Sequence, residues 1–142
     1  MRGKVQIVFD CRDPDALAAF YAVALHYQLQ DPPAGFETWQ AFLKAQGDPS
    51  PEWTSAIVDP DGTGPRLFFQ HMDTPKPPKN RLHLDINSTR GHEVSLEQRK
   101  NEVNAEVLRI AALGATKQKE FEENGEYWVV MLDPEGNEFC VQ

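Results

Sequence analysis

The sequence predicts an α+β fold built from two βαβββ modules, whose mixed sheets curve into a cup with the helices on the outside. Two observations carry this prediction. The tetrapeptide Asp-Pro-Asp-Gly at 59–62 recurs as Asp-Pro-Glu-Gly at 133–136, and apolar residues flank each copy, as expected at a hairpin tip. Upstream of each copy lie a strand pattern, an amphipathic helix and further strand patterns, so the chain consists of two similar halves.

The first half begins with an expected strand at residues 5–10, followed by a helix. Asp13 is a good N-cap, and Pro14 suits the first helical position. Apolar residues then recur with the spacing i, i+3, i+4, i+7 and i+8, which makes one apolar face. They are Leu17, Phe20, Tyr21, Ala24 and Leu25. Further strands are expected at residues 37–43, 53–58 and 66–71.

The second half repeats this order, beginning with a strand at residues 82–87. Ser95 with Gln98 resembles a capping box, and Gly114 is placed to end the helix. The expected buried stripe consists of Leu96, Val103, Val107, Ile110 and Leu113. The closing strands are expected at 116–121, 127–132 and 138–141. We expect His26 in the last turn of the first helix, His92 in a solvated loop and residues 120–126 in a solvated turn.

The length of 142 residues fits a single domain covering residues 1–142. We expect the first module at about 1–72, a linker at 73–79 and the second module at about 80–142. The linker contains three prolines, which preclude a helix and favour an extended connector.

Composition excludes several classes of protein. The net charge of −8 argues against nucleic-acid binding, which relies on clustered Lys and Arg. The longest apolar run, residues 16–25, is about half of a membrane span, so we expect no membrane partner. Two cysteines are too few for a disulfide framework, and the first residues show no signal-peptide core; both features favour a cytoplasmic protein.

Strand alternation predicts which side chains face a ligand. In each half, the apolar positions of the first strand should pack under the helix. The opposite, uncovered face then carries Gln6 in the first half and His83, Asp85 and Cys140 in the second. If the two sheets curl toward each other, this face becomes the wall of a cavity.

The pattern resembles the vicinal oxygen chelate superfamily, which includes glyoxalase I, fosfomycin-modifying enzymes, extradiol dioxygenases and bleomycin-resistance proteins. The resemblance is carried by DPDALAAFYAVAL at 13–25 and WVVMLDPEGNEFCVQ at 128–142. KNRLHLDI at 79–86, ALGAT at 112–116 and DPEGNEFCV at 133–141 are similar to the glyoxalase-like domain subgroup. Such a fold carries many chemistries, so the resemblance is more specific for fold than for function.

The resemblance implies one divalent metal in the cup, held by the first strand of each module and by a carboxylate on the closing strand. Those positions fall on Gln6, on His83 and on Cys140, which stands where the family has Glu. The first module's closing strand offers Phe69 or Gln70 at the matching place. We expect either no cofactor or one divalent metal, with zinc favoured if Cys140 is a ligand. Because this ligand set departs from the usual pattern, glyoxalase I activity itself is not expected.

Two functional interpretations stay open. In the first, the metal site is degenerate and the cup binds a small organic molecule, aromatic molecules included, as bleomycin-resistance proteins do. Trp39 and Trp128 are then the preferred aromatic pocket residues. His83 could then act as a base oriented by Asp85, without metal. In the second, the protein is a divalent-metal-dependent lyase, isomerase or transferase. A weaker third possibility is an interaction module that acts through its dimer surface, because members of this fold often pair, and a homodimer is expected.

Overall fold

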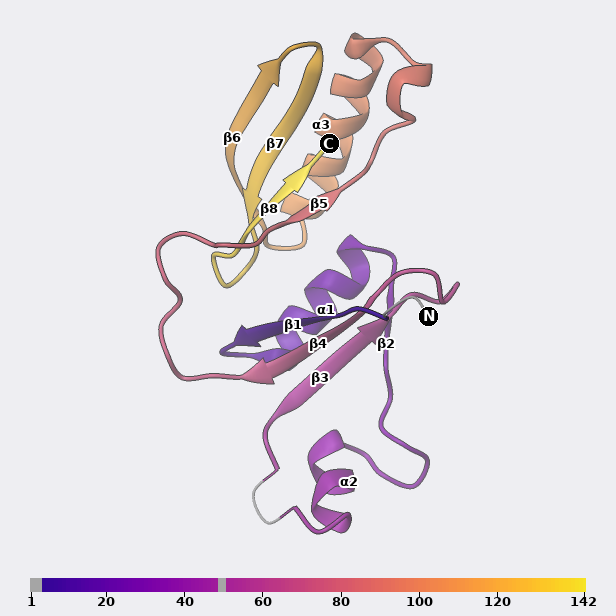
Figure 1. Cartoon of the computed structure of the whole chain (residues 1–142), viewed down its shortest axis with the longest axis vertical. Helices are drawn as coiled ribbons and strands as arrows, with labels where there is room; N and C mark the ends of the chain where they lie inside the picture. Colours follow the sequence, from indigo (N-terminus) through magenta and orange to yellow (C-terminus); the bar gives the residue numbers. More distant parts are fainter. Residues whose placement is uncertain (1–3, 49–50) are drawn as a thin grey trace. The chain divides into compact units, whose positions relative to one another are not determined.

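The computed structural model describes residues 4–48 and 51–142, which form two compact units, Met1–Thr74 and Pro75–Gln142 (Figure 1). The boundary lies inside the proline-rich segment predicted as the linker. Each unit contains a four-stranded mixed sheet. The α+β class and the repeated βαβββ order are therefore confirmed, whereas the action of the two units as one domain stays a prediction.

The first unit has its strands in the order β1-β4-β3-β2, with β1 parallel to β4. Its elements are β1 (Gln6–Cys11), α1 (Pro14–Ala24), β2 (Gln28–Leu29), α2 (Trp39–Ala45), β3 (Thr54–Val58) and β4 (Arg66–His71). Helix α1 covers one face of this sheet (Figure 1), where the Tyr21 ring lies 5.0 Å from the Phe9 ring. The side chains of Gln6, Val8 and Asp10 alternate with the packed ones and are exposed.

The ends of α1 follow from local sequence. The Asp13 side chain accepts a hydrogen bond from the Ala16 N–H at 2.9 Å, and Pro14 occupies the first turn, as predicted. His26 has a positive φ of 58° and lies beyond the C-cap rather than in the last helical turn. The Tyr27 N–H donates to the Ala22 carbonyl at 2.8 Å, which closes the helix in the manner of a Schellman motif.

The strand predicted at residues 37–43 is wrong, because the segment forms helix α2. Thr38 is its N-cap and accepts from the Ala41 N–H at 3.1 Å. The helix contains no β-branched residue and several good helix formers, so its intrinsic preference agrees with the cap. The second strand of the module is instead the two-residue β2, which pairs with β3.

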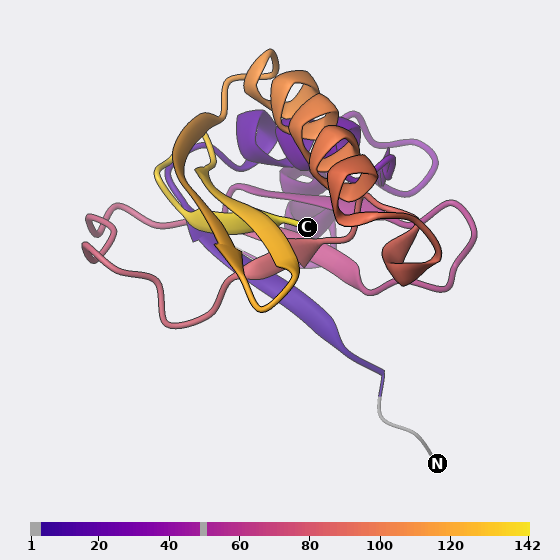
Figure 2. The same ribbon diagram turned by 90° about the horizontal axis from the view of Figure 1, so that it is seen from above.

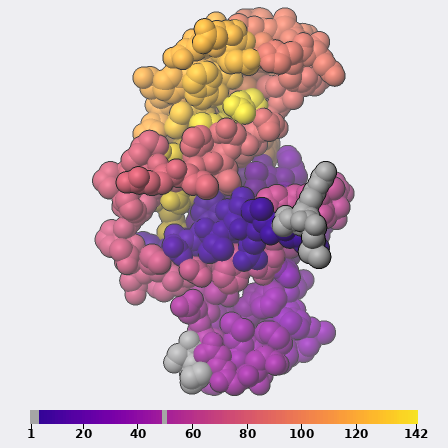
Figure 3. Space-filling view, viewed as in Figure 1, coloured from indigo at the N-terminus to yellow at the C-terminus, as the bar shows by residue number. Residues whose placement is uncertain are grey.

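The second unit repeats the arrangement with the order β5-β8-β7-β6 and with β5 parallel to β8. Its elements are β5 (Leu84–Ile86), η1 (Gly91–Glu93), α3 (Leu96–Ala111), β6 (Thr116–Glu123), β7 (Glu126–Leu132) and β8 (Glu138–Val141). Helix α3 begins with the predicted Ser95–Gln98 capping box and lies beside the β6–β7 hairpin (Figure 2). The chain then ends at the surface of this unit, beyond β8 (Figure 3).

The repeated turns close equivalent hairpins, β3–β4 and β7–β8, as predicted. In each turn the aspartate carbonyl accepts from the glycine N–H, at 3.0 Å in the first and 2.9 Å in the second. Gly62 and Gly136 have φ of 68° and 83°, a conformation that glycine adopts without strain. Within the described residues, no helix has the length and apolar character needed to cross a membrane.

Candidate functional site

The uncovered face of the second unit's sheet is built by strand register. Asp85 of β5 lies opposite Cys140 of β8, so their side chains share one face. The neighbouring Phe139 and Val141 are fully buried on the other face. The predicted strand at 82–87 is shorter in the structure, and His83 lies immediately before β5. Alternation nevertheless predicted the shared face of Asp85 and Cys140 correctly.

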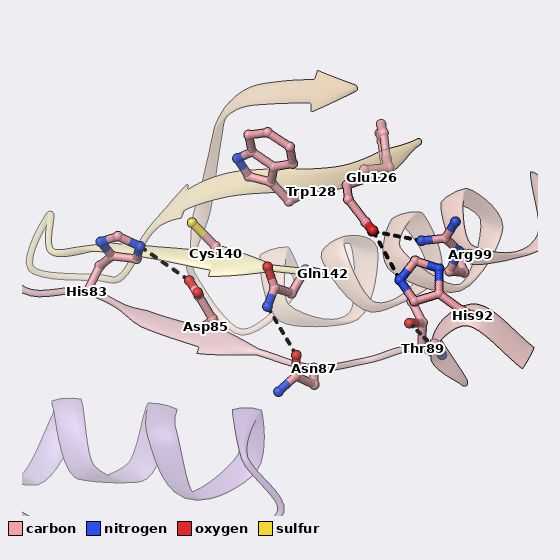
Figure 4. Close-up of a pocket in the computed structure, with 12 residues that line it drawn as sticks. His83, Asp85, Asn87, Thr89, His92, Arg99, Glu126, Trp128, Cys140 and Gln142 are labelled. Carbon is pink, nitrogen blue, oxygen red and sulfur yellow. Dashed lines mark hydrogen bonds and ion pairs between the residues drawn. The ribbon is translucent and has the colours of Figure 1, made fainter. Parts of the chain in front are cut away.

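His83, Asp85 and Cys140 form a cluster at one end of a pocket in this unit (Figure 4). His83 Nε2 lies 3.3 Å from Asp85 Oδ1, and one donor atom from each of the three residues lies within 4.8 Å of the others. About half of the His83 and Asp85 side chains is exposed (48% and 44%), whereas Cys140 is only 8% exposed. A ligand on this face could therefore reach the imidazole and the carboxylate directly.

The Cys140 thiol is held in its neutral form. The pKa of this thiol is raised from 9.0 to about 11, and burial is the largest cause; the negative charge of Asp85 and its hydrogen bond with the thiol act in the same direction. Glu138 raises this pKa further, and only Lys79 opposes the shift. At neutral pH Cys140 is thus a hydrogen-bond donor to Asp85 rather than a thiolate nucleophile.

The other end of the pocket holds a second charged cluster that the sequence did not reveal. Glu126 contacts His92 Nε2 at 3.1 Å and accepts a hydrogen bond from Arg99 Nη1 at 2.8 Å (Figure 4). Arg99 also donates to the Gly125 carbonyl at 2.9 Å. These residues come from η1, α3, the β6–β7 turn and the start of β7, and no sequence spacing links them. His92 was predicted in a solvated loop and Glu126 in a solvated turn, whereas Arg99 lies in the predicted helix and was not a candidate.

The indole ring of Trp128 lines the pocket between the two clusters (Figure 4). Its ring stacks on Phe121 with centroids 5.2 Å apart and planes 10° from parallel. The pair comes from neighbouring positions of β6 and β7, which lie opposite each other in register. The cavity that this ring and the two clusters line has a volume of about 500 Å³, which is large enough for a small organic molecule.

The candidates Gln6, Gln70 and Phe69 belong to the first unit. Gln6 Oε1 accepts from Arg66 Nη1 at 2.7 Å, and Gln70 Nε2 donates to Asp10 Oδ1 at 2.6 Å. Phe69 is fully buried and stacks on Phe9 at 5.2 Å, under α1. The structure thereby separates the two alternatives for the closing strand: Gln70 is on the uncovered face, and Phe69 is a core residue.

Trp39 is also placed differently from its prediction, since it opens α2 instead of lying in a strand. Its indole N–H donates to the Gln30 carbonyl at 3.1 Å. The ring lines a separate cavity of about 310 Å³ within the first unit. Of the predicted site residues, the structure therefore brings together His83, Asp85, Trp128 and Cys140 around one pocket.

The chemistry of the His83–Asp85–Cys140 cluster fits a divalent cation. Imidazole nitrogen, carboxylate oxygen and sulfur are the donors that zinc and other borderline cations accept. A cation would have to displace the thiol proton, and the raised pKa of Cys140 makes this displacement costly. Within the first unit, the amide oxygen of Gln6 already accepts a hydrogen bond from the Arg66 guanidinium.

Comparison with protein families gives a match over nearly the whole chain. The model of a family described as "Glyoxalase-like domain" matches residues 6–142. No curated protein matches the chain.

Solved structures of similar fold cover the whole chain at low identity. A mutant of the fosfomycin resistance protein FosX from Listeria monocytogenes, in complex with Mn(II) and 1S,2S-dihydroxypropylphosphonic acid, has a TM-score of 0.65 and 15% identity, covering 100% of this chain and 92% of that one. A glyoxalase/bleomycin resistance protein/dioxygenase family enzyme from Burkholderia phytofirmans has a TM-score of 0.61 and 19% identity, covering 96% and 94%. A domain of the same description from Frankia has a TM-score of 0.61 and 14% identity, covering 99% and 96%. At these identities the likeness shows the fold alone.

Proposed function

The chain belongs to the glyoxalase-like domain family, and on that premise we propose that it binds a small organic molecule on the uncovered face of its second sheet, with a degenerate metal site. The observation that carries this proposal is the pocket in which the Trp128 ring stands beside the His83–Asp85–Cys140 cluster. The surface thus combines an aromatic platform with a few polar groups, which is the usual composition of a small-molecule site.

Trp128 and Phe121 support a flat ligand. The Trp128 ring lines the pocket, and its stacking on Phe121 restricts its motion, so it offers a rigid aromatic surface. An aromatic or otherwise planar molecule would cover this surface while its polar groups face His83 and Asp85.

His83 and Asp85 are the proposed proton-transfer pair. Asp85 Oδ1 lies 3.3 Å from His83 Nε2 and so orients the ring, which leaves Nδ1 to accept a proton from the ligand. The neutral Cys140 thiol holds the carboxylate from its buried side. This arrangement would allow isomerase or lyase chemistry that requires only a general base.

Binding on the aromatic surface can be tested by a fragment screen that follows the indole N–H signals in proton–nitrogen correlation spectra. We expect planar fragments to shift the Trp128 signal and to bind at least about tenfold more weakly to Trp128→Ala. Trp53→Phe, in the first unit, is the matched control. The proposal would be contradicted if the fragments bind equally well to Trp128→Ala, or if no fragment shifts the Trp128 signal of the unmodified protein.

Proton transfer is tested separately from binding. For a fragment that carries an acidic C–H bond, His83→Gln should abolish solvent deuterium exchange at that carbon and leave the dissociation constant within about twofold. Exchange that persists in His83→Gln would remove His83 from this role.

A divalent-metal-dependent enzyme is the second candidate. It is favoured by the three donor atoms within 4.8 Å of one another and by a structural neighbour of this chain, a FosX mutant, that was solved with Mn(II). His83, Asp85 and Cys140 would hold the ion, and the thiolate would favour zinc. Such an ion would act as a Lewis acid toward ligand oxygens.

Elemental analysis of tag-free protein, purified without chelators, separates the two candidates. Near-stoichiometric metal that is lost in both His83→Ala and Cys140→Ser would establish the metal site. His71→Ala is the control: His71 also lies beside a carboxylate, 2.9 Å from Asp73 Oδ1, but among the described residues it belongs to no group of three potential metal ligands. If the protein contains no metal and its melting temperature does not rise on adding divalent ions, the metal-dependent candidate is excluded and the metal-free function is retained.

Two further features of the protein are proposals of the same kind. Members of the family often form dimers, so we expect a homodimer. Light scattering after size-exclusion chromatography should then give twice the mass of the chain.

A reducing cytoplasmic location is supported by the two cysteines, both buried and neither disulfide-bonded. A fluorescent fusion that localises outside the cytoplasm would overturn this proposal.

A further inference from the structure

The first unit contains a pocket whose charge is opposite to that of the whole chain. This cavity of about 630 Å³ is lined by Lys4 and Arg66, together with Val5, Gln6 and the turn 62–65. Among the residues that the structure describes, no acid lines it, and the nearby Asp59 carboxylate accepts hydrogen bonds from Thr63 and Gly64 of the turn. The pocket of the second unit includes Asp85 and Glu126, and that near Trp39 includes three acids and no cation. A local positive site is notable in a protein with a net charge of −8.

Arg66 is held in place by neutral groups. Its Nε donates to Gln30 Oε1 at 2.6 Å, and its Nη1 donates to Gln6 Oε1 at 2.7 Å. The guanidinium also lies over the Phe68 ring, 5.1 Å from the centroid. These contacts orient the guanidinium without cancelling its charge.

No acidic residue compensates Arg66. Within residues 4–48 and 51–142, no carboxylate approaches it to ion-pair distance, and its Nη2 has no hydrogen-bond acceptor. Partial burial also lowers the pKa of Arg66, although a guanidinium remains charged at neutral pH. A partly desolvated cation without a counter-charge is unfavourable, and a bound anion would remove that cost.

We propose that this pocket binds the oxyanion group of a small molecule, a carboxylate or a phosphate, with Arg66 Nη2 as the donor and Lys4 as a second positive charge. Gln6 and Gln30 are positioning residues, since they act through the guanidinium. The exposed Val5 side chain would contact the apolar part of the same molecule. This inference does not depend on the function proposed for the second unit.

The test follows the Arg66 Nε–H signal in proton–nitrogen correlation spectra of the intact protein. Sodium benzoate, sodium acetate and inorganic phosphate are titrated separately, with sodium chloride at equal ionic strength as the reference. We expect a saturable shift with a dissociation constant at or below the millimolar range for at least one oxyanion. A response to benzoate and acetate identifies a carboxylate site, and a response to phosphate alone identifies a phosphate site.

Variants then assign the binding to this guanidinium. Arg66→Gln should weaken binding at least about tenfold, and Gln6→Leu, which keeps the charge but removes one orienting oxygen, should weaken it by a smaller factor. Arg81→Gln removes the same charge from an exposed position in the second unit and should have no effect. Shifts that stay linear and match those with chloride, or equal affinity in Arg66→Gln, would overturn the proposal. If Arg66→Gln does not fold, the wild-type titration and Gln6→Leu decide by the same criteria.

Discussion

The raised pKa of Cys140 makes a quantitative prediction about thiol reactivity. In a Cys11→Ser background Cys140 is the only thiol. At a pH of about 8, a thiol with its ordinary pKa is roughly one-tenth thiolate, whereas a pKa of about 11 leaves roughly one-thousandth. Alkylation by iodoacetamide should therefore be about a hundredfold slower than that of an ordinary thiol, before any further effect of restricted access.

Asp85→Asn tests the cause of this shift. The substitution removes the negative charge that repels the thiolate and the carboxylate that accepts a hydrogen bond from the neutral thiol, but it leaves burial, the largest cause, in place. The alkylation rate should rise several-fold and remain well below that of an ordinary thiol. Asp73→Asn, an exposed acid in the first unit, should leave the rate unchanged.

The shape of the pH–rate profile separates ionisation from access. Restricted access lowers the rate equally at every pH, whereas a raised pKa moves the midpoint of the profile to about 11. A midpoint at or below 9.0 would refute this reasoning and would make Cys140 a thiolate available to a metal or a substrate.

Unfolding in urea tests three further features of the second unit. Because the pKa of Cys140 is higher in the folded protein, the free energy of unfolding should fall as the pH rises from 9.0 through about 11. An equal fall in Cys140→Ser would contradict this cause. Asp133→Ala should lower the free energy of unfolding by roughly 3 kcal/mol, since this buried carboxylate accepts hydrogen bonds from Glu135 and Asn137. A decrease below about 1 kcal/mol would show that the turn does not depend on these bonds. Ser95→Ala should cost about 1 kcal/mol by removing the capping box, whereas Ser95→Thr should retain most of it; equal losses would argue against the cap.

The parts of the fold that depend on near neighbours in the chain were predictable. The Asp13 cap, the Ser95 capping box and the two Asp-Pro-x-Gly turns each form between residues at most a few positions apart. Thr38 caps α2 in the same way, so this helix also has a local signal, which the strand predicted at residues 37–43 left out of account.

The candidate site was predictable only along its strands. Alternation placed Asp85 and Cys140 on one face, because a parallel register preserves the alternation of both strands. The cluster around Glu126 was not predictable, since His92 and Arg99 reach it from other elements across a turn. Their meeting depends on how η1 and α3 pack beside the hairpin.

The sequence by itself determined the repeated βαβββ order, the helix caps, the hairpin turns and the family, because these depend on short-range contacts and on motifs. Tertiary structure alone decided the state of each site residue. The resemblance implied a metal-ligand position at Gln6, yet the amide oxygen of Gln6 accepts a hydrogen bond from Arg66, 60 residues away. Likewise, the thiol of Cys140 is kept neutral by burial and by Asp85, 55 residues before it in the chain. Such contacts depend on strand pairing and burial, and neither can be read from the local order of residues.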